Sequence, residues 1–202
     1  MLSGAIHLII VSWHKRYECT FMKTYKPVFR NQIILLKYIF RDLLIFAIAY
    51  VLFIVIEFHE YYLEGAKIFT AAFILADLFP SLILYLQYIN YSEDMEINVD
   101  STDRTFDIKV NNVNHSFAFD QIKSVRIVIT QRLRNNSFNR FAWNIFHYSI
   151  VEIEKGEKYY ITFFFQNDLR KFFADLKINA IIENSFFPWI TTYKYERSKD
   201  GW

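Results

Sequence analysis

An acidic residue and a proline interrupt an otherwise apolar run, AAFILADLFPSLILYL, at residues 71–86. Asp77 lies three positions before Pro80, so a carboxyl group and the helix kink expected at proline share one region. In a soluble core a buried carboxyl group is costly unless it is compensated, and in a membrane helix an ionisable side chain at mid-depth indicates function. A neighbour, or Ser81, must also satisfy the carbonyl of Ala76 that Pro80 leaves without its usual donor.

Two interpretations of Asp77 follow from its surroundings. In the first, the carboxyl group is structural, and it is protonated or hydrogen-bonded within a helical hairpin or a dimer. In the second, it is the centre of a small transport subunit or of a proton or ion relay. The preceding apolar segment has no second acid or histidine at matching depth, which favours the structural interpretation. Tyr50 is the polar side chain near the middle of that segment, so we predict a Tyr50–Asp77 hydrogen bond.

No other part of the sequence has the arrangement of a catalytic centre. A glycine-rich phosphate loop, a nucleophile elbow and paired carboxylates beside a base are all missing. His59 lies beside Glu57 and Glu60, but their spacing is not that of a zinc site, and the single cysteine, Cys19, excludes a multi-cysteine site. We therefore expect no enzyme activity, no cofactor and no metal. A formal net charge of +2 without a basic run also argues against nucleic acid as a partner.

Two apolar segments, at about residues 38–58 and 68–88, have the length of membrane spans. About 21 residues of helix reach about 31 Å, the thickness of a hydrocarbon core. The chain before them is rich in lysine and arginine, whereas the connector EFHEYYLEGAK is mainly acidic. The positive-inside rule then predicts a multi-pass protein of the cell inner membrane with both termini in the cytoplasm.

The second segment ends in an aromatic cluster. Tyr85, Tyr88 and Tyr91 in this position are typical of a membrane-interface belt. The alternative for both segments is a pair of buried helices in a soluble protein.

After Ser92 apolar and polar residues alternate, which is typical of strands with one covered face. The segments MEINV, TFDIKV, NHSFAF and IKSVRIVIT, with NIFHYSIVEI and KYYITFFF after them, predict an antiparallel meander. A final amphipathic helix is expected to begin at Asn167 or Asp168 and to end by residue 187, before Pro188. Its predicted apolar stripe consists of Leu169, Phe172, Phe173, Leu176, Ile178, Ile181 and Ile182.

A basic, amide-rich segment, QRLRNNSFNRFAW, separates two of the predicted strands. Arg132, Arg134 and Arg140 lie there, close to Trp143, and form a candidate loop for contact with lipid or a partner. Each cationic side chain would contribute about 1 kcal/mol beside an anionic leaflet. A solvated loop is the alternative that we favour, because the sequence identifies no partner residue.

The strand pattern resembles that of a known family. FAFDQIKSVRIVIT resembles the third and fourth strands of bacterial pleckstrin-homology (PH)-like domains, and FHYSIVEIEKGEKYYITFFFQNDLRKFFADL resembles their last two strands and helix. With the preceding hairpin, the chain is similar to membrane-anchored bacterial PH-like proteins over about residues 38–184. The resemblance implies an antiparallel β-barrel or sandwich capped by a C-terminal helix. It does not extend to phosphoinositide binding, because the loop at residues 100–104 is mainly acidic.

We therefore expect an α+β membrane protein in which a two-helix transmembrane hairpin precedes a PH-like domain. The predicted parts are a cytoplasmic segment at 1–32, of which 1–21 could precede the true start, the hairpin at 33–91, the PH-like domain at 92–187 and a polar tail at 188–202. The predicted function is a cytoplasmic interaction or assembly module. Its expected partners are the lipid bilayer and an unidentified protein, with a homo-oligomer among the options. A relay at Asp77 and anionic-lipid recognition by the arginine loop are the alternatives.

Overall fold

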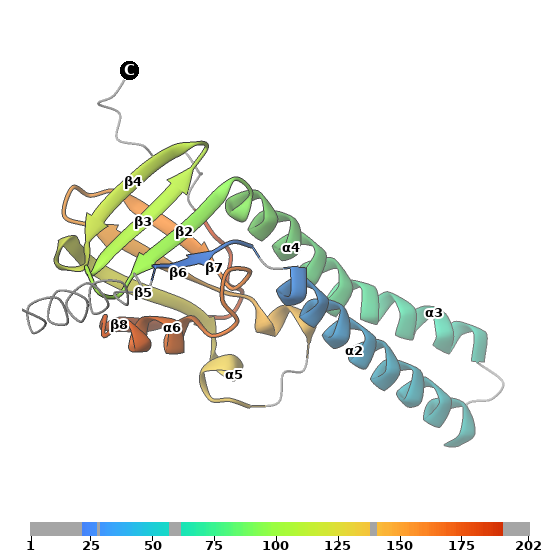
Figure 1. The fold of residues 1–202 in the computed structure, drawn as a ribbon. Coiled ribbons are helices and arrows are strands. Elements are labelled where there is room, and N and C mark those ends of the chain that lie inside the picture. The colour runs from blue at the N-terminus through green and yellow to red at the C-terminus, as the bar shows by residue number, and fades with distance from the viewer. Residues whose placement is uncertain (1–21, 28, 57–61, 138–140, 192–202) are drawn as a thin grey trace, which may run out of the picture.

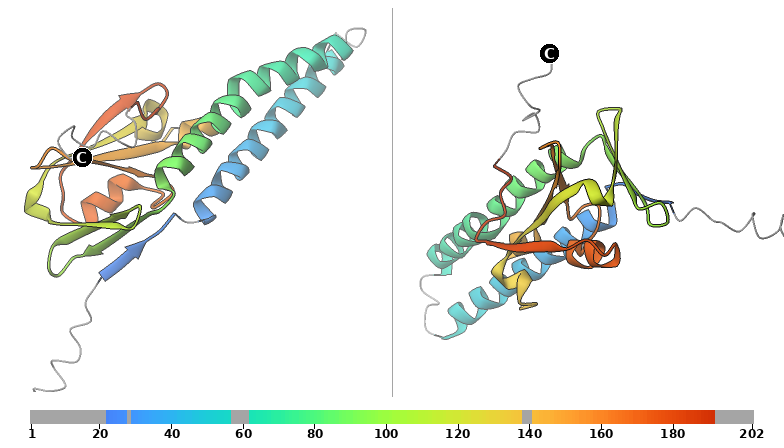
Figure 2. Two further views of the ribbon diagram at one scale, coloured as in Figure 1. Left: turned by 90° about the horizontal axis from the view of Figure 1, so that it is seen from above. Right: turned by 90° about the vertical axis from the view of Figure 1, so that its left-hand side faces the viewer.

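The computed structural model describes residues 22–27, 29–56, 62–137 and 141–191. An arm of two antiparallel helices projects from a β-sandwich (Figure 1). Figure 2 shows that the arm lies along the sandwich at one end and extends well beyond it at the other. The predictions made for residues 1–21 and 192–202 lie outside the described residues.

The arm consists of α2 (Phe29–Ile56) and a longer helix that runs through α3 (Tyr62–Phe73), η2 (Ile74–Leu78) and α4 (Phe79–Ser92). In η2, a turn of π-helix, the N–H of Phe79 donates to the carbonyl of Ile74. Pro80 cannot donate to Ala76, and the wider turn accommodates this defect without ending the helix. The predicted helical hairpin is thus confirmed, whereas its insertion into a membrane stays a prediction.

Two helices of the arm are long and apolar enough to cross a membrane. They are Ile33–Val55, with a mean hydropathy of 2.2, and Leu63–Ser92, with a mean hydropathy of 1.9. Only 6% of the most apolar stretch of the first helix and 22% of that of the second are buried inside the protein. The side chains of the arm are therefore mostly unpacked on their outer surface.

The hairpin is inserted into the first sheet and does not precede it. β1 (Met22–Tyr25) pairs antiparallel with β2 (Met95–Asp100), so that Met22 lies opposite Asp100 and Tyr25 lies opposite Ile97. The predicted start of the β-domain at residue 92 therefore omits its first strand. MKTY was missed because it is short, contains a lysine and is separated from its partner by the whole hairpin.

The first sheet, sheet A, has the strand order β1-β2-β3-β4. β3 (Thr105–Val110) and β4 (Val113–Ala118) form a hairpin. Its two-residue turn is made by Asn111 and Asn112, whose φ angles of 49° and 65° fit a type I′ turn. The predicted meander is confirmed in this sheet.

The second sheet, sheet B, has the order β7-β6-β5-β8. Its strands are β5 (Ile122–Thr130), β6 (His147–Ile153), β7 (Lys158–Thr162) and β8 (Ala180–Ser185). β5, β6 and β7 are antiparallel as predicted, but β8 is parallel to β5.

The predicted long C-terminal helix is wrong beyond its first two turns. α6 spans only Leu169–Asp175, and Asp168 caps it by accepting the N–H groups of Arg170 and Lys171. Lys177 follows with a φ of 56°, which turns the chain out of the helix. Ile181 and Ile182 then belong to β8, because their spacing fits an alternating strand as well as a helical stripe.

The interior of the sandwich is apolar and lies between the two sheets and α6. Phe106, Ile97, Ile108, Ile127 and Ile161 are almost completely buried there. Phe172 and Phe173 of α6 close one end of this core.

A second apolar cluster joins α4 to the outer face of sheet B. Tyr88 is fully buried and packs edge-on against Phe146, and its hydroxyl donates to the carbonyl of Pro188 at 2.8 Å. Gln87 bonds to the backbone of Ile190 through both of its amide atoms. The aromatic cluster that was expected at a membrane interface therefore packs partly on the β-domain, and the start of the expected polar tail is ordered against α4.

Candidate functional site

A polar junction links the arm to the β-domain near the π-helical turn. Its contact on the domain side is η4 (Ala142–Ile145), a short 3-10 helix. The N–H of Ala142 donates to Oδ1 of Asp77 at 2.6 Å, and the indole Nε1 of Trp143 donates to the carbonyl of Ala76 at 3.0 Å. Trp143 thus supplies the donor that Pro80 lacks, as the sequence required of some neighbour.

The junction contains a second buried acid, Asp42 of α2. Asp42 is 1% exposed and Asp77 is 0% exposed, and their carboxyl groups interact directly. Nε of Arg41 donates to Oδ1 of Asp42 at 2.7 Å, and its guanidinium lies over the ring of Tyr38. The Oδ2 atoms of both acids have no hydrogen-bond donor among the described residues.

The sequence pattern did not single out Asp42, because this residue lies near one end of the first apolar segment and not at its middle. In an antiparallel hairpin, two residues face each other when they lie equally far from the connector. Asp42 and Asp77 meet this condition because α2 ends at Ile56 and α3 begins at Tyr62, so that both acids lie about equally far from the connector. The sequence alone did not give this symmetry, because the connector EFHEYYLEGAK is centred on residue 62.

The predicted Tyr50–Asp77 hydrogen bond does not form. Tyr50 lies beside Phe69, with 5.9 Å between the ring centroids, about two helical turns from Asp42. Asp77 instead faces the β-domain through Ala142. The carboxyl group therefore belongs to the contact between the arm and the domain.

Replacing Trp143 by phenylalanine is expected to lower the free energy of unfolding by about 1–3 kcal/mol, because the buried carbonyl of Ala76 loses its donor. The measurement is denaturant unfolding of the full-length protein in detergent. Trp189→Phe is the matched control, since Trp189 is 41% exposed and its indole makes no hydrogen bond to the described residues. Equal losses in the two variants would contradict the role given to the indole.

The arginine loop is only partly as predicted. Arg132 and Arg134 lie on α5 (Gln131–Arg134), a single turn capped by the hydroxyl of Thr130. The carbonyl of Arg134 accepts a bond from the side chain of Arg170 at 3.3 Å. Arg140 lies outside the described residues. Trp143 is buried at the junction, so its expected role as a surface contact is wrong.

The edge of β4 presents free backbone groups. Val110 and Val113 flank the two-residue turn and form a hydrogen-bonded pair, so the odd-numbered residues of β4 bond to β3. The N–H of Ala118 bonds to the side chain of Gln121 at 3.0 Å, which agrees with this assignment. The N–H and C=O groups of Asn114 and Ser116 must therefore point away from β3.

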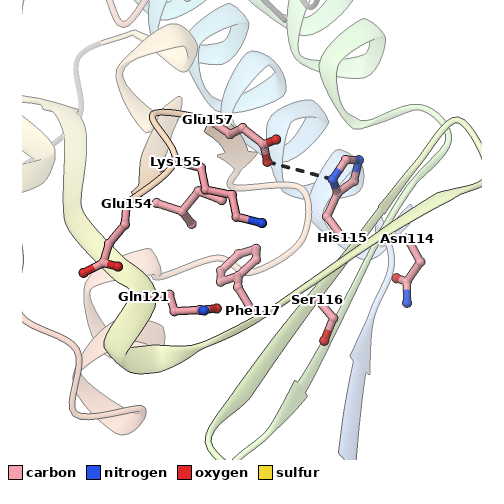
Figure 3. Close-up of a pocket in the computed structure, with 9 residues that line it drawn as sticks. Asn114, His115, Ser116, Phe117, Gln121, Glu154, Lys155 and Glu157 are labelled. Carbon is pink, nitrogen blue, oxygen red and sulfur yellow. Dashed lines mark ion pairs between the residues drawn. The ribbon is translucent and has the colours of Figure 1, made fainter. Parts of the chain in front are cut away.

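A cavity of about 270 Å³ lies against this edge. It is formed by β4 and the turn between β6 and β7 (Figure 3), and its lining residues are Asn114, His115, Ser116, Phe117, Gln121, Ile153, Glu154, Lys155 and Glu157. Oε2 of Glu157 accepts the hydroxyl of Tyr159 at 2.7 Å and lies 3.9 Å from Nδ1 of His115. The cavity thus joins an apolar floor to charged walls.

No group of three histidine, cysteine, aspartate or glutamate side chains that could hold a metal occurs among the described residues. The cluster around His59 lies in the part of the chain that is not described.

The fold is a sandwich of two four-stranded sheets with a short helix at one end. A family model described as PH domain matches residues 24–168, and the chain belongs to the PH domain family. The match begins in β1 and spans the inserted hairpin, and it confirms the PH-like resemblance. No curated protein and no solved structure matches the chain. Domains of this family are generally non-catalytic and commonly bind lipids or proteins.

Proposed function

We propose that the protein is a PH-domain interaction module that the inserted hairpin anchors in a membrane. The observation that carries the proposal is the exposed apolar surface of the arm. Phe40, Val55, Ile68 and Leu75 are between 67% and 73% exposed, and they lie on both helices. Exposed apolar side chains along two helices of spanning length are typical of contact with lipid and not of contact with water.

The topology of sheet A supports a two-span anchor. β1 precedes the hairpin and β2 follows it, yet the two strands are neighbours in one sheet. Both ends of the hairpin must therefore leave the bilayer on the same side, which an even number of spans provides. The basic segment before the first span supports a cytoplasmic location for that side, and the proposed location is a bacterial inner membrane.

The junction would fix the orientation of the domain relative to the bilayer. Asp77, Trp143 and Tyr88 bind the arm to the β-domain at separate points along one helix. Such a module would present the same face of its sandwich to cytoplasmic partners, because the anchor cannot rotate freely about a linker.

The membrane anchor is tested by alkaline carbonate extraction of the full-length protein. We expect the protein to stay in the membrane pellet, and release like a peripheral protein would contradict the anchor. Ile48→Asp with Leu52→Asp should prevent stable insertion, because each charge costs about 3 kcal/mol in the centre of a span. Val113→Asp with Ile181→Asp, which changes exposed apolar residues of the β-domain, is the matched control and should leave the protein in the pellet.

A relay through the arm has less support. Asp42 gives Asp77 the second acid that a relay requires, but residues 43–56 and 65–76 contain no carboxyl or imidazole group. The acid pair therefore has no continuation along the described part of the arm. A structural role at the junction accounts for it better.

A further inference from the structure

We propose that the free edge of β4 binds an extended segment of a partner protein by strand addition. This inference rests on the proposed interaction role and names the surface that performs it. Asn114 and Ser116 offer two outward N–H groups and two outward carbonyls at the spacing of a β-ladder. An extended backbone is the ligand whose donors and acceptors match this row.

β4 is more suitable than the other three sheet edges. β1 has only four residues. β7 lies against α4, where Ser92 and Thr162 share a hydrogen bond of 2.6 Å. β8 is flanked by α5 and α6. Val113–Ala118 also contains no lysine or proline, the residues that commonly protect an edge strand from pairing.

The cavity would select one side chain of the bound segment. Successive side chains of an added strand point to opposite faces, so every second one turns toward the sandwich. Phe117 and Ile153 form the apolar part of the cavity. The cavity walls carry the two carboxylates of Glu154 and Glu157 and the one ammonium group of Lys155. This net negative charge favours a neutral or basic side chain over an acidic one.

The test uses full-length protein in lipid nanodiscs and a phage-displayed library of random ten-residue peptides, counter-selected on the Ser116→Pro variant. Proline removes an outward N–H without removing a bond to β3, so sheet A is expected to remain intact. The enriched peptide is then synthesised. It should bind Ser116→Pro at least about tenfold more weakly than the parent protein, and Ser116→Ala, the matched control, within about twofold.

Two further measurements are independent of the folding of the proline variant. Bound peptide should slow hydrogen exchange at the amides of Asn114 and Ser116. N-methylation of the peptide, one residue at a time, should weaken binding at alternate positions, since only every second amide of an added strand faces β4. A library that yields no such peptide, equal binding to both Ser116 variants or an N-methylation profile without alternation would each overturn the proposal.

A second copy of the chain on this edge would also overturn it, and a Ser116→Cys variant that forms disulfide-linked dimers in nanodiscs would reveal that outcome. Failure of the anchor and failure of the edge are distinguishable. Release by carbonate refutes the anchor and leaves peptide binding to β4 untouched, whereas a stable pellet without peptide binding refutes the edge alone.

Discussion

Phe106→Ala is expected to lower the free energy of unfolding by about 3–5 kcal/mol. Phe106 is 0% exposed and lies at the centre of the sandwich core. Its ring stacks on Phe117 at 5.6 Å between centroids, and it meets Phe119 and Phe172 at 6.5 and 6.4 Å. Alanine would leave a cavity among rings that cannot all move inward.

Urea unfolding of the full-length protein in detergent, followed by near-ultraviolet circular dichroism, measures this loss. Ile181→Ala is the control, because Ile181 is 62% exposed on β8 and its removal should change stability by no more than about 0.5 kcal/mol. A loss below about 1 kcal/mol for Phe106→Ala would mean that the two sheets do not enclose a packed core.

Acid is expected to destabilise the β-domain through His147. Burial lowers the pKa of His147 from 6.5 to about 4, although the carbonyl of Ile145 opposes this shift through a hydrogen bond. Between these two values the unfolded chain binds a proton that the folded chain does not. The contribution of His147 alone to the stability therefore falls by about 3 kcal/mol as the pH falls from about 6.5 to about 4.

The corresponding measurement is the slope of unfolding free energy against pH for three proteins. The difference in slope between the parent protein and His147→Gln in this range should equal the His147 contribution, whatever the effect of the substitution on absolute stability. His115→Gln, a histidine substitution on β4, should retain the slope because His147 is still present. If His147→Gln and the parent protein have the same slope, the imidazole is not buried in its neutral form.

Local pattern predicted most of the sheets. Each of the strands β2 to β7 lies close in sequence to at least one partner, so turns such as Asn111–Asn112 determine the pairing. β1 and β8 were not predicted from the sequence, because their partners are not local. β1 has only four residues, and each of the two pairs with a strand that is distant in sequence, across the hairpin for β1 and across β6, β7 and α6 for β8.

The candidate site was predictable only in part, because its function depends on tertiary contacts. The sequence identified Asp77 and the unpaired carbonyl of Ala76, since proline chemistry is local. It did not identify Ala142 and Trp143 as their partners, because nothing in the linear order brings η4 to the arm. The free edge of β4 was likewise not predictable. Which residues of β4 bond to β3 and which point away is defined only once the turn and the register of the hairpin are known.

The insertion of the hairpin between β1 and β2 also sets the order of folding. Met22 leaves the ribosome long before Asp100, so β1 must wait for its neighbour while both helices of the arm are made. Antiparallel association of these helices brings the two ends of the insertion together and so reduces the entropy cost of closing a long loop. Pairing of the two helices should therefore speed the addition of β1 to sheet A.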